Sequence, residues 1–303
     1  MGWLSAGYGL KDHTVFWYGG YYYIASIYYS TDAQREQFFA YARSTDLCEW
    51  EDLTPILEGR VYSRWDYVAV WAPFVYEEAG VYYMYYTGLG SDYVQSIMLV
   101  TSTNPADTLS WEPQGMIFQP DHPGMIWKVG TWADCRDPMV LKVEDTYYMY
   151  YTGRDEDGGI VGLATSVSPL GPWYDWGSII TLPDDGARSS GPLGVRMPES
   201  ATVFPHAGMY YLFYNSRGEY YHVGAGPSGP WSEASEFYPG WAHEIWTGQD
   251  GKTYASYLVG YPNYAIAISQ LIWDDFYFPH RPFIGQYIYH ISIPLLSNNV
   301  STP

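Results

Sequence analysis

The sequence predicts an all-β protein built as a five-bladed β-propeller, with four antiparallel strands in each blade. Aromatic residues make up 19% of the 303 residues, including 34 tyrosines, and such residues favour half-buried pleated strands. A tyrosine doublet recurs five times inside strand-like runs, and a turn rich in Ser, Thr, Pro and Gly follows each doublet. Repeats of this kind, spaced by roughly 45 to 65 residues, are typical of propeller blades.

Each repeat begins with a predicted β-hairpin. Apolar runs flank a short turn that contains Gly or acidic residues, as in residues 72–76 and 80–86. Two such runs around a turn are typical of a hairpin. The five doublets lie in residues 20–24, 80–86, 146–151, 208–214 and 251–257.

A third strand, a turn ending in tryptophan and a fourth strand complete each repeat. The clearest turns end at Trp173 and Trp231, and similar turns end at Trp50 and Trp111. A sandwich or jelly roll could share the strand count, but it would not explain the repeated order of turns. We expect one domain over residues 1–303, with blades at roughly 9–60, 65–118, 132–182, 190–238 and 241–290.

Charge and composition exclude several classes of protein. The formal net charge of −19 argues against binding to nucleic acid or to an anionic membrane. Cys48 and Cys135 form neither a disulfide framework nor a zinc site, and no apolar run is long enough to cross a bilayer. The first residues lack the basic and apolar regions of a signal peptide. We therefore expect a cytoplasmic protein, or a secreted or periplasmic one if a leader has been removed.

Acidic residues recur at one position of the repeat. Counting ten residues back from the first tyrosine of each doublet gives Asp12, Ala72, Asp137, Ser200 (beside Glu199) and Glu244 (beside His243). This position begins the innermost strand, whose side chains we expect to face the central channel. Clustering like charges there costs several kcal/mol unless a proton is retained. The register therefore predicts a functional cluster of Asp12, Asp137 and Glu199, although each acid alone could be a turn or rim residue.

Three converging carboxyl groups suit the cleavage of a glycosidic bond. One protonated acid donates to the leaving oxygen, and one carboxylate activates water or attacks the anomeric carbon. A third charge can hold the pKa of the acid high and orient it. A propeller that only binds glycan, with the same acids contacting sugar hydroxyls, is the alternative from another class.

The segments 71–86, 136–153 and 198–214 resemble the five-bladed propeller glycoside hydrolases, most closely family 43 and more distantly family 32. The resemblance covers about residues 11–288. It implies a glycosidase that acts on a pentose-containing or related oligo- or polysaccharide, such as an α-L-arabinofuranoside or a β-xyloside. No cofactor is implied, apart from a calcium ion or a water near His243.

The resemblance also assigns roles. It implies that Asp12 is the general base, Glu199 the general acid, and Asp137 the residue that orients the acid and raises its pKa. The substrate-binding residues that it implies are Trp71, Arg136 and His243, and we add His13 as a substrate contact because it stands where the family has proline. Arg136 and Asp137 are neighbours in a strand and should face opposite ways unless a bulge intervenes.

Two departures from the family bear on mechanism. Asp12 is followed by His13, where the family has Asp-Pro, and the Asn-Asp-Pro-Asn-Gly and Glu-Cys motifs of family 32 are absent. Inversion is therefore favoured, and a retaining fructan hydrolase or transferase is the alternative on the same fold. We expect loops near residues 59–66, 89–93, 120–131 and 184–196 to decide the substrate.

Overall fold

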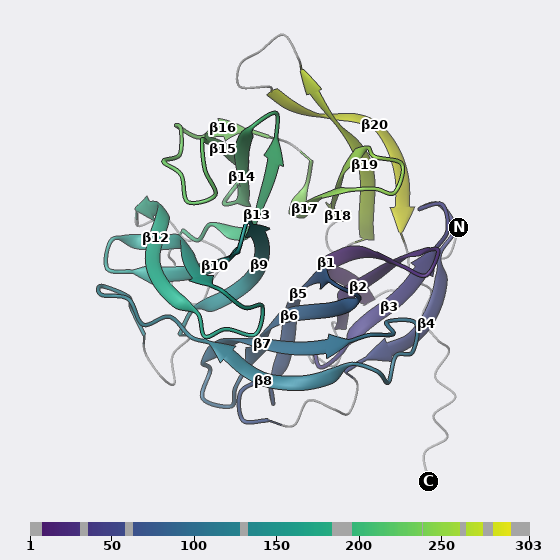
Figure 1. Cartoon of the computed structure of the whole chain (residues 1–303), viewed down its shortest axis with the longest axis horizontal. Helices are drawn as coiled ribbons and strands as arrows, with labels where there is room; N and C mark the ends of the chain where they lie inside the picture. The colour runs from purple at the N-terminus through teal and green to yellow at the C-terminus, as the bar shows by residue number, and fades with distance from the viewer. Residues whose placement is uncertain are drawn as a thin grey trace.

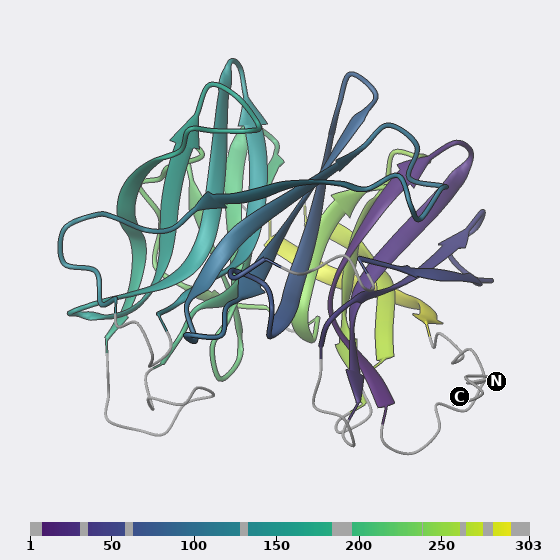
Figure 2. The same ribbon diagram turned by 90° about the horizontal axis from the view of Figure 1, so that it is seen from below.

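The computed structural model describes residues 8–30, 36–57, 63–127, 133–183, 196–237, 239–260, 265–274 and 281–291. These residues form five four-stranded antiparallel sheets, which surround a central axis (Figure 1). The strands run from one face of the disc toward the other (Figure 2). The predicted five-bladed propeller is therefore confirmed.

Every blade is one continuous stretch of chain. Blade 1 holds β1 (Tyr8–Tyr18), β2 (Tyr21–Ser30), β3 (Phe39–Ser44) and β4 (Glu51–Ile56). Blade 2 holds β5 (Ala69–Glu78), β6 (Val81–Leu89), β7 (Gln95–Ser102) and β8 (Glu112–Phe118). Blade 3 holds β9 (Cys135–Val143), β10 (Thr146–Asp155), β11 (Gly158–Ser166) and β12 (Tyr174–Pro183). Blade 4 holds β13 (Glu199–His206), β14 (Met209–Asn215), β15 (Glu219–Gly224) and β16 (Ser235–Glu236). Blade 5 holds β17 (Trp241–Thr247), β18 (Thr253–Val259), β19 (Ala265–Asp274) and β20 (Arg281–Ile291).

Tight two-residue turns join the first and second strands of several blades. Both central residues of the β1–β2 turn, Gly19 and Gly20, have positive φ. Ala79 with Gly80 and Ala207 with Gly208 show the same pattern. Two successive positive φ angles define the type I′ turn, whose twist matches that of the flanking strands. These turns fix the hairpin register that the sequence pattern predicted.

The innermost strands share a β-bulge. Pairing with the second strand shifts between Leu10 and His13 in β1, and equivalent shifts occur in β5, β9, β13 and β17. In four of these strands a residue of the bulge has φ between 45° and 56°, namely Ala72, Asp137, Ser200 and Ala242. A bulge places two residues opposite one and re-aims their side chains. Successive side chains can therefore approach the channel together.

Tyrosine hydroxyls join neighbouring blades. Tyr41 of blade 1 donates to the carbonyl of Pro105 in blade 2 at 3.0 Å. Tyr85 of blade 2 donates to Pro169 of blade 3 at 2.7 Å, and Tyr150 of blade 3 donates to the carbonyl of Pro227 in blade 4 at 2.6 Å. Each ring is buried while its hydroxyl reaches a backbone acceptor, so the ring adds apolar packing without an unpaired polar group.

Side-chain packing closes the ring between the first and last blades. Leu10 and Ile24 of blade 1 pack in one cluster with Leu258 and Ile266 of blade 5. The Tyr22 hydroxyl accepts the backbone N–H of Gln249 at 2.8 Å. No sheet borrows a strand from the other end of the chain among the described residues. The same part of the chain holds no helix that is long and apolar enough to cross a membrane.

Candidate active site

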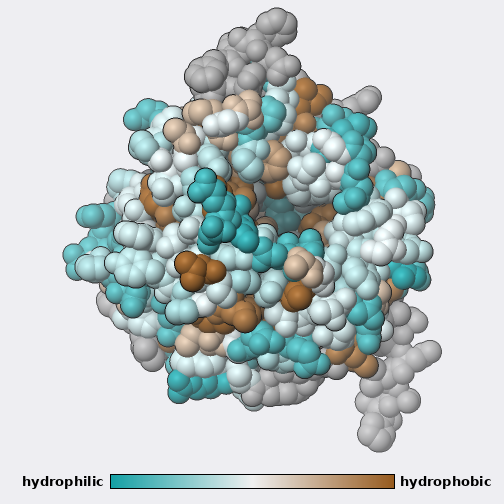
Figure 3. Space-filling model, in the orientation of Figure 1, coloured by the Kyte–Doolittle hydropathy of each residue, from teal (hydrophilic) through white to brown (hydrophobic). Residues whose placement is uncertain are grey.

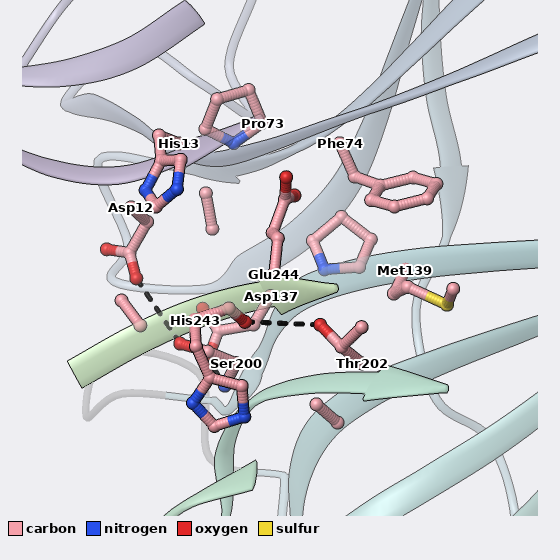
Figure 4. A pocket seen from close by; sticks show the side chains of 14 residues that line it. Asp12, His13, Pro73, Phe74, Asp137, Met139, Ser200, Thr202, His243 and Glu244 are labelled. Carbon is pink, nitrogen blue, oxygen red and sulfur yellow. Dashed lines mark hydrogen bonds between the residues drawn. The ribbon is translucent and has the colours of Figure 1, made fainter. Parts of the chain in front are cut away.

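Acidic side chains of blades 1 and 3 meet at the channel, as the register predicted. Asp12 and Asp137 line the same axial cavity, and Ser200 of blade 4 joins them (Figure 4). The Ser200 hydroxyl donates to Asp12 Oδ1 at 3.3 Å, and the Ser200 N–H donates to Asp137 Oδ2 at 3.0 Å. Three blades therefore contribute to one hydrogen-bonded cluster.

Arg136 connects Glu199 to this cluster. Its Nη2 donates to Glu199 Oε1 at 2.8 Å, and its Nε lies 3.9 Å from Asp137 Oδ2. Its Nη1 also donates to Asp134 Oδ1 at 2.5 Å. The bulge in β9 lets neighbouring Arg136 and Asp137 approach the same point, where regular alternation would have separated them. No pattern in the sequence marks Asp134, because its contact with Arg136 depends on this local geometry.

The surroundings of the cluster raise the pKa values of Asp12 and Glu199. Burial, followed by the charges of Asp137 and Glu199, raises the pKa of Asp12 to about 7. Burial also raises the pKa of Glu199, with Asp137 adding to the effect and Arg136 opposing it. Burial disfavours the charge of Arg136, but the carboxylates of Glu199, Asp134 and Asp137 outweigh it and raise the pKa of Arg136. A raised pKa is what a carboxyl group needs to act as a general acid near neutral pH.

Two threonines hold Asp137 in place. Thr152 Oγ1 donates to Asp137 Oδ2 at 3.0 Å, and the Asp137 N–H donates to Thr87 Oγ1 at 3.1 Å. Neither threonine was among the site residues predicted from the sequence. The available signal was the Tyr-Tyr-Thr-Gly pattern that ends the second strand in blades 2 and 3, at residues 85–88 and 150–153.

His13 and His243 lie in the lining of the axial cavity. Both imidazoles are buried, and their ring nitrogens have no hydrogen-bond partner of good geometry within the described ranges. Burial, together with the nearby His243, lowers the pKa of His13 to about 3, and burial lowers the pKa of His243 to about 4. Burial raises the pKa of Glu244, which lines the same cavity and accepts the Val15 N–H at 3.3 Å. The two imidazoles are therefore neutral at physiological pH.

The side chains of His13, His243 and Glu244 offer few ligands of the kind that calcium prefers. Calcium takes six to eight oxygen ligands, whereas His13 and His243 offer imidazole nitrogens and Glu244 offers one carboxyl group whose pKa burial raises. No group of three His, Cys, Asp or Glu able to hold a metal occurs in the part of the chain described above. The cavity volume of about 30 Å³ suits one or two water molecules. Of the two occupants implied for the surroundings of His243, water fits these residues.

Trp71 of blade 2 packs against the apolar cluster shared by blades 1 and 2. Its indole N–H donates to Glu36 Oε2, and Lys11 Nζ contacts Glu36 Oε1 at 2.6 Å. Its role as a sugar platform remains a prediction. The molecule is hollowed where the blades meet (Figure 3). Residues 58–62, 128–132 and 184–195 of the loops expected to choose the substrate lie outside the described residues.

The fifth blade corrects one register expectation. Counting back from Tyr254 gave Glu244, but the bulge of β17 places Ala242 at the position of Ala72. The turn between Thr247 and Thr253 is longer than the two-residue turns of blades 1, 2 and 4. The count from the doublet is therefore wrong by two residues in blade 5.

Comparison with known proteins supports the resemblance found in the sequence. The family model described as glycosyl hydrolases family 43 matches residues 8–128. No curated protein sequence matches the chain.

Solved structures match over nearly the whole chain. An exo-1,5-α-L-arabinanase from a bovine ruminal metagenomic library has 17% identity and a TM-score of 0.64, covering 94% of this chain and 99% of that one. A GH43_1 enzyme from Xanthomonas citri, complexed with xylotriose, has 21% identity and a TM-score of 0.63, covering 98% and 94%. Sucrose-6-phosphate hydrolase from Lactobacillus gasseri has 17% identity and a TM-score of 0.68, covering 88% of this chain and 59% of that one.

At these identities the structures show the shared fold, and the family model supplies the sequence relationship. The matched residues include the motif around Trp71, whereas Asp137 and Glu199 lie beyond them. The described residues form a five-bladed β-propeller like those of the solved structures above, and residues 8–128 match the glycosyl hydrolases of family 43.

Proposed function

We propose that the chain is an inverting glycosidase acting on arabinan- or xylan-type glycans. The convergence of Asp12, Asp137 and Glu199 from three blades, joined through Ser200 and Arg136, carries the proposal. The substrate class is supported by the structural neighbours, which include an enzyme named as an arabinanase and one complexed with xylotriose. Paired carboxyl groups flanking the scissile bond are the usual machinery of glycoside hydrolysis.

In the proposed mechanism, Glu199 protonates the departing glycosidic oxygen while Asp12 takes a proton from the attacking water. The water oxygen bonds to the anomeric carbon as the bond to the leaving oxygen breaks, so the product sugar has the opposite anomeric configuration. Asp137 is fixed by Thr152 and Ser200, and its charge helps to keep a proton on Glu199.

One observation favours a second assignment of roles. Arg136 pairs with Glu199 at 2.8 Å and stabilises its ionised form, whereas burial and two neighbouring carboxylates raise the pKa of Asp12 to about 7. These electrostatics suit Asp12 as the acid and Glu199 as the base. The first assignment requires substrate binding to weaken the Arg136 contact or to desolvate Glu199 further.

Leaving-group dependence separates the two assignments. We expect Glu199→Gln to lower kcat/KM on an arabino- or xylo-oligosaccharide by about 10²–10⁴-fold, and far less on a dinitrophenyl glycoside, whose leaving group needs no proton. Asp12→Asn should lose activity on both substrates. The opposite pattern would reverse the roles. Full activity of both variants on both substrates would exclude this pair of carboxyl groups.

Proton NMR of the first-formed anomer tests the stereochemistry. Inversion is expected on arabino- and xylo-oligosaccharides. Retention, together with release of fructose from sucrose or a fructan, would instead support the retaining alternative. Sucrose and fructans should be tested as substrates too, because the chain shares its fold with sucrose-6-phosphate hydrolase.

A further inference from the structure

The outer strand of blade 3 presents an exposed aromatic pair. Tyr174 and Trp176 of β12 have 62% and 61% of their surface exposed, although most tyrosines and tryptophans of the chain lie inside the blades. Their ring centroids are 4.7 Å apart, with planes at 66°. Val167 and Leu170, in the turn that leads into β12, are also exposed, at 84% and 52%. One edge of one blade therefore gathers several exposed apolar side chains.

This edge is almost free of charge. Residues 158–183 contain one charged side chain, Asp175, in a protein with a net charge of −19. Hydroxyl groups lie beside the aromatic pair: Trp176 Nε1 donates to Thr165 Oγ1 at 2.9 Å, and Ser178 pairs with Thr181 at 2.7 Å. The surface offers aromatic rings and hydroxyls. A neutral ligand rich in C–H and O–H groups fits this chemistry better than a charged partner does.

The strand is held firmly from behind. Asp175, between the two aromatic residues, is buried and accepts hydrogen bonds from the Tyr151 hydroxyl and the His122 ring at 2.7 Å each. The next residue but one, Gly177, has φ of +78°, and a Cβ there would meet His122 Cδ2 at 3.0 Å. A rigid support lowers the entropy cost of binding. The aromatic pair is therefore preorganised.

We propose that Tyr174 and Trp176 form a second glycan-binding site, which takes a strand of neutral polysaccharide. Aromatic rings stack on the C–H faces of sugars and combine apolar area with fixed geometry, and the neighbouring hydroxyls suit sugar hydroxyls. The ligand class rests on the proposed function. The position does not, because β12 is the outermost strand of its sheet and β9, which carries Asp137, is the innermost (Figure 1).

Because β12 lies at the outer edge of blade 3, we expect this second site to affect only substrates that are long enough to reach both β12 and the channel. A chain held at blade 3 raises the effective concentration of cleavable bonds near the channel, as linked binding sites do. A short aryl glycoside occupies the channel without reaching β12. Short substrates therefore report on the channel alone, whereas polymers report on both sites.

Binding without turnover tests the site. Soluble arabinan and xylan are titrated by affinity gel electrophoresis against a Glu199→Gln protein, with Trp176→Ala or Tyr174→Ala added. We expect Trp176→Ala to weaken polymer affinity about tenfold, the effect of one lost stacking platform. Leu109→Ala removes an equally exposed apolar side chain from blade 2 (63% exposed) and should leave affinity unchanged. Unchanged affinity in both blade 3 variants would overturn the proposal.

Two further measurements distinguish a glycan-binding site from a surface for self-association. With Glu199 intact, Trp176→Ala should keep its kcat/KM on a nitrophenyl glycoside and lose rate on dilute polymer. If light scattering shows a wild-type dimer that Trp176→Ala dissociates, with polymer affinity unchanged, the pair is a self-association surface and the proposal fails. A wild type that binds polymer through Trp176 yet cleaves no glycoside would instead contradict the proposed function alone.

Discussion

Arg136 and Glu199 form a largely buried ion pair, with Nη2 and Oε1 2.8 Å apart and 12% and 18% of the two side chains exposed. Arg43 and Glu51 form a pair of similar length, 2.7 Å, at the exposed edge of blade 1. The two pairs have the same chemistry in different surroundings. They provide a matched comparison of what burial does to an ion pair.

Arg136→Gln should destabilise the protein by about 3–5 kcal/mol at pH 7.5, because it leaves buried carboxylates without their cation. Arg43→Gln should cost less than about 1 kcal/mol. Denaturant unfolding measures both values. At pH 5 the cost at Arg136 should shrink, since Asp12 and Glu199, whose pKa values are raised, take up protons. Equal costs for the two variants would contradict the buried network.

Asp12→Asn should stabilise the protein while abolishing activity. The pKa of Asp12 is about 7 in the folded chain and about 4 when unfolded, so the folded state binds more protons between these values. Stability then falls as pH rises from about 4 to about 7. Because Asn carries no charge, the gain should reach about 2–4 kcal/mol at pH 8 and vanish toward pH 4.

Thermal unfolding at pH 4.5, 6 and 8 measures this gain. Asp145→Asn, in the exposed turn between β9 and β10, is the control and should show no such trend. A gain at Asp12 that does not change with pH would argue that the side chain stays ionised throughout.

Thr152→Val should lower kcat by about tenfold or more, with a small change in KM. The substitution removes the hydroxyl that donates to Asp137 Oδ2 at 3.0 Å and leaves the shape of the side chain nearly unchanged. Thr152→Ser keeps the donor and should retain most activity. Steady-state kinetics on one aryl glycoside distinguish the two variants. Equal losses would indicate a packing role for Thr152.

His122 should stabilise blade 3 in a pH-dependent manner. Burial alone lowers the pKa of His122, but hydrogen bonds to Asp155 and Asp175, at 2.7 Å each, outweigh burial and raise it. The stabilisation is therefore complete below pH 6.5 and is lost as pH rises through the folded pKa. Asp155→Asn should cost about 1–3 kcal/mol at pH 5.5 and less at pH 9.

Asp157→Asn changes an exposed acid in the same turn and serves as the control. Urea unfolding of both variants at the two pH values gives the comparison. A penalty at Asp155 that is the same at pH 5.5 and pH 9 would mean that His122 is neutral in both conditions.

Spacing in the sequence predicted the blades and two of the three acids well, because hairpin turns fix the register along each inner strand. Asp12 and Asp137 lie ten residues before their doublets and meet at the channel. Glu199 lies one residue earlier and faces Arg136. That contact depends on the bulges in β9 and β13. No pattern of residue types in the sequence predicts these bulges.

Other features could not be predicted, since they depend on contacts between distant segments. His122 meets partners 33 and 53 residues away, and Glu36 reaches both Lys11 and Trp71. In blade 5 the longer turn between Thr247 and Thr253 shifted the count. Turn length is a local property of the backbone that the tyrosine doublets do not encode.

Because no sheet among the described residues spans blades 1 and 5, the seam between these two blades has a consequence for heat inactivation. Asp12 belongs to the blade beside this seam, whereas Asp137 and Glu199 lie two and three blades further along the chain. If blades 1 and 5 separate slightly on warming, each sheet stays whole while Asp12 moves away from its partners. Catalysis would then disappear at a lower temperature than the β-sheet circular dichroism signal does.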